Sequence, residues 1–372
     1  FTLNNDQARE KKTSLIILNN NRVASPQFAP QGFRVVAIMH AYNEEDIVIP
    51  VLKHLIDQGI EIYFVDNWST DKTYELAQLF LDRGVIGVER FPPEGPTTFY
   101  EWERQLKRTE ELCQTLEADW FIHHDLDEIR ESPWTPMSLK DGIYYIDQMG
   151  FNAIDHTVIN FFPTNNDYES EGLLHKNFKY FEFGTISGHF LQIKAWKNLH
   201  CSIRLSASGG HEAKFDGRKV YPYKFLLKHY PFRSQLQAER KVFDERKPRW
   251  NAKERLKGWH TQYDPIKQGD TFLHTPASLE CFDETFHQRF IVERLSGVGV
   301  VRKPAQMCDS PNMPAPSPGV NLNGNLAEFR GYQEFFLLHK PLRVVANSEI
   351  LKRKQELLSP LFNSSYLKHR TV

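Results

Sequence analysis

Residues 120–128 read Trp-Phe-Ile-His-His-Asp-Leu-Asp-Glu, an apolar stretch that runs directly into an acidic one. The apolar part predicts a short buried strand, because a run of this length without polar alternation suits a strand covered on both faces. Asp125 and Asp127 follow at a spacing of two, so their carboxylates face the same way at the strand end. Hard oxygen ligands of this kind suit Mg²⁺ or Mn²⁺. The stretch therefore predicts a strand that ends in a metal-binding acid pair.

The same order of apolar run and polar end occurs twice upstream. Residues 35–39 lead into the polar segment 41–44, and residues 60–65 lead into Asp66 and the segment 67–73. Helical patterns separate these strands, and strands that alternate with helices predict a parallel sheet covered on both faces. The carboxyl ends of such strands meet at one edge, where these sheets bind their ligands.

The pattern changes after residue 142. Strand-like segments at 143–146, 157–161 and 188–193 are separated by loops, and a basic stretch at 234–262 has a helical pattern. The predicted organisation is a leader segment at 1–32, an α/β domain at 33–245 and a C-terminal helical extension at 246–372 that contains a proline-rich linker at 310–319.

Composition excludes several classes of protein. A net charge of −1 argues against a nucleic-acid binder, which would be basic. Four cysteines without a Cys-x-x-Cys pair fit neither a zinc ribbon nor a disulfide scaffold, and favour the cytoplasm. No stretch approaches the ~18 apolar residues of a membrane span. The 13% aromatic content suits a sugar-binding surface and equally an aromatic core.

Three motifs in order resemble the family 2 glycosyltransferases with the GT-A fold: His40 to Glu45, Val65 to Thr73, and Asp125 to Glu128. The resemblance covers roughly residues 33–245. It implies an α/β fold with a mixed, mostly parallel central sheet flanked by helices. It also implies inverting transfer from a nucleotide-sugar donor to a glycan or glycolipid acceptor, with Mn²⁺ or Mg²⁺ as cofactor, in bacterial surface polysaccharide synthesis. The corresponding location is the cytoplasm or the inner face of the membrane.

The resemblance assigns Glu44 and Asp66 to the nucleoside, and Asp125 and Asp127 to the metal. It also suggests a late histidine, His229, as a third metal ligand. Arginine matches phosphate oxygens in a bidentate way, so the basic segment is a candidate for holding the diphosphate; its alternative is a solvated helix face. The predicted nucleotide-sugar site comprises Ala41, Tyr42, Glu44, Asp66, Asn67, Asp125, Arg233, Arg240 and Lys241.

Inverting transfer implies one base that acts on the acceptor hydroxyl. Glu212 and His211 follow two glycines, which allow a ligand to approach closely, and both side chains can accept a proton. Asp155 is the next candidate. Trp134 is either an apolar platform for the acceptor sugar or a core residue. The segment 247–250 contains Arg-Trp without the glutamine of polymerising members, so processive synthesis is not expected.

Other functions stay open from sequence. A metal-dependent hydrolase could use His123 and His124 with the acid pair, and a non-catalytic GT-A fold could bind carbohydrate with its aromatics. A nucleotidyltransferase is disfavoured because no glycine-rich loop follows the first strand. The C-terminal ~70 residues could bind a partner, a membrane surface or a neighbouring domain.

Overall fold

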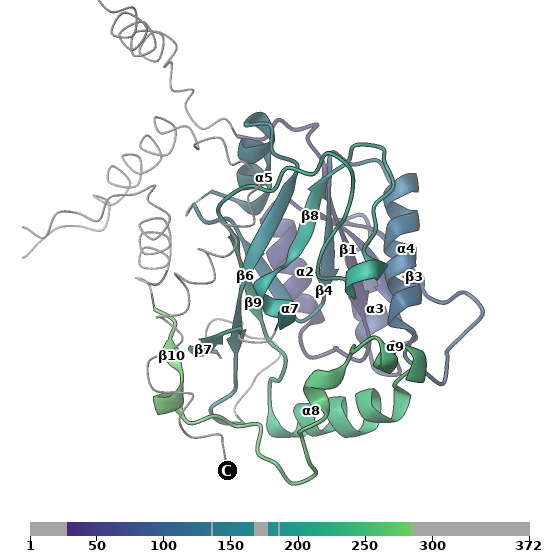
Figure 1. Ribbon diagram of the computed structural model, residues 1–372, viewed down its shortest axis with the longest axis vertical. Helices are drawn as coiled ribbons and strands as arrows, with labels where there is room; N and C mark the ends of the chain where they lie inside the picture. The colour runs from purple at the N-terminus through teal and green to yellow at the C-terminus, as the bar shows by residue number, and fades with distance from the viewer. Residues whose placement is uncertain (1–27, 135–136, 167–177, 185–186, 284–285, 287–372) are drawn as a thin grey trace, which may run out of the picture. The chain divides into compact units, whose positions relative to one another are not determined.

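The computed structural model describes residues 28–134, 137–166, 178–184, 187–283 and 286 (Figure 1). Residues Pro26–Glu284 form one compact unit. The predicted proline-rich linker, and most of the predicted leader and C-terminal extension, lie outside the described residues. The predicted domain boundaries therefore stay predictions.

One half of the sheet is parallel. Its strands are β1 (Val35–Ala41), β2 (Glu61–Asp66), β3 (Val85–Arg90) and β4 (Trp120–Asp125), in the order β3-β2-β1-β4. All seven residues of β1 are buried, because this central strand is covered on both faces. The predicted parallel sheet is confirmed.

Helices α2 (Val48–Asp57), α3 (Thr73–Gln78) and α4 (Trp102–Thr115) connect these strands and flank the sheet (Figure 1). The sequence of α2 explains its position. Val48, Val51, Leu52 and Leu55 are buried and recur at helical spacing, so they form one apolar stripe that packs inward. Each helix returns the chain to the start of the next strand, which brings the polar strand ends to a single edge.

The other half of the sheet is mixed. Strand β8 pairs antiparallel with β4, β6 pairs antiparallel with β8 and β7, and β9 lies parallel to β6 and antiparallel to β5. The mixed α/β architecture agrees with the predicted fold class. The bounds are β5 (Glu128–Glu131), β6 (Ala153–Phe161), β7 (Tyr180–Phe183), β8 (Ile193–Lys197), β9 (Phe225–His229) and β10 (Glu280–Cys281).

Two predicted strands in this half differ from the structure. Residues 143–146 lie in helix α5 (Leu139–Gln148), where Ser138 accepts a hydrogen bond from the Asp141 backbone N–H as N-cap. Its apolar residues recur at helical spacing, and a short apolar run alone does not separate a helix from a strand. Residues 188–193 divide between the short helix α7 (Ser187–Phe190) and the start of β8.

The basic stretch at 234–262 forms a chain of short helical pieces. Pro248 interrupts it, because proline lacks a backbone N–H and clashes with the preceding turn. The pieces are α8 (Gln235–Glu239), the π-helical turn η2 (Arg240–Arg246), η3 (Lys247–Arg249), α9 (Ala252–Leu256) and η4 (Thr261–Tyr263); the remaining short turns are η1 (Ser206–Ser208) and η5 (Pro276–Ser278).

Helices in the described part of the chain lack the length and apolar character that crossing a membrane would require.

Candidate active site

A cavity of about 760 Å³ lies at the carboxyl ends of β1, β2 and β4. The ends of these three strands supply residues to its wall, as the order of strands and helices predicts. Later segments of the chain close the other sides. Among the residues predicted for the site, those that line the cavity are Ala41, Tyr42, Glu44, Asn67, Asp125, Asp127, His211, His229 and Lys241.

Each carboxylate of the acid pair is held by a buried lysine. The Asp125 Oδ2 atom accepts a hydrogen bond from Lys194 Nζ at 2.6 Å, and Asp127 Oδ2 accepts one from Lys241 Nζ at 2.8 Å. Burial alone would raise the pKa of both carboxyls, but the attraction of Lys194 and Lys241 outweighs it and lowers both. Both carboxylates are therefore ionised at neutral pH and face the cavity as anions.

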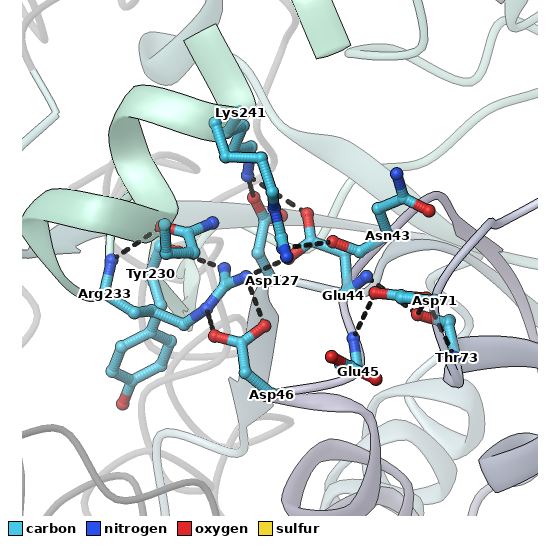
Figure 2. A network of polar contacts seen from close by, with 12 residues as sticks. Asn43, Glu44, Glu45, Asp46, Asp71, Thr73, Asp127, Tyr230, Arg233 and Lys241 are labelled. Atoms are coloured by element: carbon cyan, nitrogen blue, oxygen red, sulfur yellow. Dashed lines mark hydrogen bonds and ion pairs between the residues drawn. The ribbon is translucent and has the colours of Figure 1, made fainter. Parts of the chain in front are cut away.

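Lys241 connects two of the predicted motifs. Figure 2 shows its amine between Asp127 and Glu44, where the distance to Glu44 Oε1 is 3.2 Å. The opposing carboxylates overcome the effect of burial and raise the pKa of Lys241, so its charge is retained. The π-helical turn η2 thus places the buried amine of Lys241 between the ends of β1 and β4.

Arg233 occupies the same network but does not line the cavity. Its guanidinium is fully buried, forms an ion pair with Glu44 and donates to Asp46 Oδ2 at 2.5 Å (Figure 2). Arg240, also predicted for the diphosphate, pairs with Glu245 at 3.1 Å and donates to the Asn43 carbonyl. Of the three predicted phosphate-binding cations, the structure brings only Lys241 to the cavity.

Asp66 is fully buried at the end of β2, beside the cavity-lining Asn67. Its Oδ2 atom accepts a hydrogen bond from the Ser69 backbone N–H at 3.0 Å. Its Oδ1 atom has no hydrogen-bond partner within the described residues. Burial raises the pKa of this carboxyl to about 6, against the opposing effect of the Ser69 hydrogen bonds. Such an oxygen can accept a further donor.

Arg249 covers Tyr42, a residue of the predicted nucleotide-sugar site. Its guanidinium lies 4.1 Å from the centre of the Tyr42 ring, and its Nη2 atom donates to Asn67 Oδ1 at 3.3 Å. The face of Tyr42 that a base could stack on is therefore in contact with a cation.

Two cavity cations escaped the sequence reasoning. Lys194 lies on β8 with 3% of its side chain exposed, and the cavity-lining Arg246 ends η2. The signal for Lys194 was an isolated charge within the apolar run Ile-Lys-Ala-Trp, where a buried strand would normally carry none. Arg246 had no distinguishing signal within a segment that contains many basic residues.

The three predicted bases lie in different surroundings. Glu212 pairs with Arg218 at 2.6 Å, and Asp155 pairs with Lys224 at 2.8 Å; neither lines the cavity. His211 does line it, and burial lowers its pKa to about 4, so the ring is neutral near pH 7. Of the three predicted bases, only His211 therefore lines the cavity.

Trp134, the predicted acceptor platform, lies in the core. Its side chain is 3% exposed and contacts Tyr145 and Phe225 edge-on. The ring lies outside the cavity lining, which corresponds to the alternative interpretation of this residue as a core side chain.

The acid pair is a candidate site for a divalent metal. His229 Nε2 lies 3.6 Å from Asp127 Oδ2, while its Nδ1 atom contacts Asn160 Oδ1 at 2.9 Å. Within the described residues, no group of three histidine, cysteine or acidic side chains is assembled to hold a metal. Mg²⁺ is commonly held by one or two carboxylates together with substrate phosphates. Asp125 and Asp127 fit a metal bound in that way, in competition with the two lysines.

Comparisons with known proteins bear on this site. Residues 36–92 match the family described as Glycosyl transferase family 2, which confirms the resemblance over β1 to β3. No curated protein sequence matches the chain.

Solved structures are similar to part of the chain. TarS residues 1–349 from S. aureus is 13% identical over 54% of this chain and 61% of that chain, with a TM-score of 0.33. The same protein in complex with UDP is 15% identical over 53% and 60%, with a TM-score of 0.33. The mannosyltransferase PcManGT from Pyrobaculum calidifontis, in complex with GDP-Man and Mn²⁺, is 16% identical over 40% and 42%, with a TM-score of 0.27. The chain thus spans about three fifths of the TarS chains.

Proposed function

We propose that this protein transfers a sugar from a nucleotide-diphosphate sugar to a glycan or glycolipid acceptor, with inversion at the anomeric carbon. The observation that carries the proposal is the cavity at the carboxyl ends of β1, β2 and β4, where acids and buried cations from separate strand ends meet. The family match over residues 36–92 supports the same class of reaction.

The nucleoside would bind at the ends of β1 and β2. Tyr42 offers an aromatic face once Arg249 moves aside, and the second oxygen of Asp66 can accept a base N–H or a ribose hydroxyl. A buried acceptor without a partner costs free energy that a matching ligand donor recovers. This pairing would favour ligands that place a donor at Asp66.

The diphosphate would lie against the buried cations. Lys194 and Lys241 already point their amines at the acid pair, and Arg246 lines the same cavity. Fixed charges in a buried site stabilise the charge that develops on the leaving phosphate without reorganisation. Asp125 and Asp127 would hold Mg²⁺ or Mn²⁺, which when bound neutralises further charge on the leaving group.

The hydrolase alternative requires His123 and His124 as metal ligands beside the acid pair. His123 and His124 are fully buried and do not line the cavity. Within the described part of the chain their ring nitrogens have no hydrogen-bond partners, and burial lowers the pKa of both. The role in surface polysaccharide synthesis and the cytoplasmic location stay predictions.

Asp127→Asn tests the proposal. The assay measures nucleotide release from UDP-, GDP-, dTDP- and CMP-sugars. For the donor that wild type turns over, we expect the variant to be slower by about 100-fold or more, because its amide is a weaker ligand for the metal that would neutralise charge on the leaving diphosphate. The fold should persist, because Lys241 keeps its contact with Glu44. Asp264→Asn, which changes an exposed carboxylate paired with Arg255, is the control. Turnover equal to wild type in Asp127→Asn would contradict the proposal.

A further inference from the structure

One continuous segment of the cavity wall comes from beyond the predicted α/β domain. Residues 258–263, Gly-Trp-His-Thr-Gln-Tyr, all line the cavity. The segment follows helix α9, whereas the predicted domain ends at residue 245 and the family match ends at residue 92. The family match therefore assigns no role to this part of the wall.

The segment carries aromatic rings and hydrogen-bonding groups but no carboxylate, amine or guanidinium. Trp259 and His260 are half-buried, and Thr261 and Gln262 are exposed beside them. The lysines, the acids and the arginine that line the cavity all come from other segments. A wall of this kind suits a neutral ligand that is rich in hydroxyl groups, because ring faces cover C–H groups while hydroxyls and amides form hydrogen bonds.

The backbone of the segment turns sharply on both sides of Trp259. Gly258 and His260 have left-handed conformations, with φ of 79° and 62°. Such a φ is uncommon for a residue other than glycine and persists where the surrounding structure holds it. The His260 ring meets Tyr100 edge-on at 5.6 Å, and its Nε2 atom contacts Glu254 Oε2 at 3.2 Å. These contacts fix the turn that carries Trp259.

Gly209, the first of the paired glycines, makes room for aromatic rings. A Cβ atom at this position would lie 3.1 Å from Trp259 Nε1, which is tighter than an ordinary van der Waals contact. Trp102 donates from Nε1 to the Gly209 carbonyl at 2.9 Å, and its ring stacks with Tyr100 at 5.8 Å between centroids. Trp259 and this stacked pair therefore form an aromatic wall around Gly209.

One face of the Trp259 indole is covered from outside the cavity. Lys257 Nζ lies 4.9 Å from the centre of the ring and pairs with Glu103 at 2.6 Å. Lys257 does not line the cavity, although Trp259 does. The cation therefore covers the indole from the side away from the cavity, and the other face is left for a ligand.

The position of Trp259 favours the acceptor sugar over the donor sugar. The proposed function places the diphosphate against the buried cations, so the donor sugar, which is bonded to the diphosphate, lies next to them. Arg246 reaches the aromatic wall at Tyr100, where its guanidinium lies 4.8 Å from the ring centre. Trp259 packs against Gly209 instead. The indole is therefore placed for the second sugar of the reaction.

We propose that residues 258–263 form the acceptor subsite, in which a neutral pyranose of the acceptor glycan stacks on Trp259; this assignment rests on the proposed function. The indole covers the C–H face of the sugar and removes that apolar surface from water. Thr261 and Gln262 exchange hydrogen bonds with the hydroxyl groups at the edge of the sugar ring.

Trp259→Ala tests the subsite. The donor is the UDP-, GDP-, dTDP- or CMP-sugar that wild type turns over. The acceptor is the methyl glycoside of glucose, galactose, mannose or N-acetylglucosamine that raises nucleotide release furthest above the rate in water alone. We expect the KM for this glycoside to rise by about 10-fold or more, because the stacking contact is lost. The dissociation constant of the intact donor, measured by calorimetry, should be unchanged.

Two further variants separate stacking from a structural effect. Trp259→Phe keeps an aromatic face and should hold the glycoside KM within about threefold of wild type. Leu256→Ala is the matched control, because Leu256 is 90% exposed at the end of α9 and lies outside the cavity lining. It should keep the wild-type KM.

A wild-type glycoside KM in Trp259→Ala would overturn the assignment. A rise confined to the donor dissociation constant would also overturn it, because the donor sugar would then lie on the indole. Nucleotide release that no methyl glycoside accelerates would overturn it as well. These results leave donor use standing, whereas the proposed function itself fails if wild type neither binds nor turns over any of the donors.

Discussion

The surroundings of Asp66 disfavour the charged form of its carboxyl group. It is fully buried, one of its oxygens has no hydrogen-bond partner within the described residues, and burial raises its pKa to about 6. Because the folded-state pKa lies above the unfolded value, the folded protein binds more protons between about pH 4 and 6. Stability from this group is therefore present at low pH and lost as the pH rises through that window.

Asp66→Asn should remove this pH dependence. The quantity to compare is the free energy of unfolding of the variant minus that of wild type. This difference should be about 2–3 kcal/mol larger at pH 7 than at pH 4, since one pKa unit corresponds to about 1.4 kcal/mol. Urea denaturation of both proteins at the two pH values measures the difference, and comparing the two pH values cancels the packing change. An equal difference between the proteins at both pH values would show that the Asp66 carboxyl is not perturbed.

At the residue scale, sequence reasoning found the acids, and Lys241 as a candidate for the diphosphate, but not the pairing of each acid with a lysine. Asp125 and Asp127 were predictable because their strand and their spacing are local features. Lys194, 69 residues after Asp125, and Lys241, 114 residues after Asp127, meet them only in the folded chain.

Among the elements, the turn from β9 into α8 is fixed by Arg233. This side chain reaches back to Glu44 and Asp46, at the junction of β1 and α2, from almost two hundred residues later in the chain. It thereby sets the position of the following π-helical turn, which carries Lys241 and Arg246 to the cavity. Such turns often occur at functional sites.

Arg233→Ala should destabilise the fold strongly. We expect a loss of about 3–5 kcal/mol in free energy of unfolding, because the buried Glu44 and the partly buried Asp46 lose the cation they share. Arg255→Ala is the control, because its pair with Asp264 is exposed and should contribute only about 1 kcal/mol or less. Chemical denaturation measures both variants. Similar small losses in the two would mean that Arg233 does not hold the elements together.

The limits of prediction at the element scale have local causes. Residues 143–146 looked like a strand because four residues cannot display helical spacing, whereas the Ser138 cap and residues 139–148 together do. The basic stretch at 234–262 looked like one helix, but Pro248 divides it.

At the scale of the whole molecule, the parallel half was predictable and the mixed half was not. Alternating strands and helices determine a parallel order almost by themselves. The pairing of β5 with β9, and of β9 with β6, joins segments about 70 to 100 residues apart and has no local signature. The cavity wall at the ends of β1, β2 and β4 could therefore be anticipated, while the wall formed by the mixed half required the structure.

The most direct test of nucleotide-sugar binding is a thermal-shift screen of wild type against UDP-, GDP-, dTDP- and CMP-sugars, with and without Mn²⁺. A ligand present at 100 times its dissociation constant stabilises the fold by about 2.7 kcal/mol, which raises the melting temperature by a few degrees. We expect such a rise for one nucleotide, larger with Mn²⁺ because Asp125 and Asp127 can hold the metal together with the diphosphate. No rise with any donor, with or without the metal, would contradict a nucleotide-sugar site at this cavity.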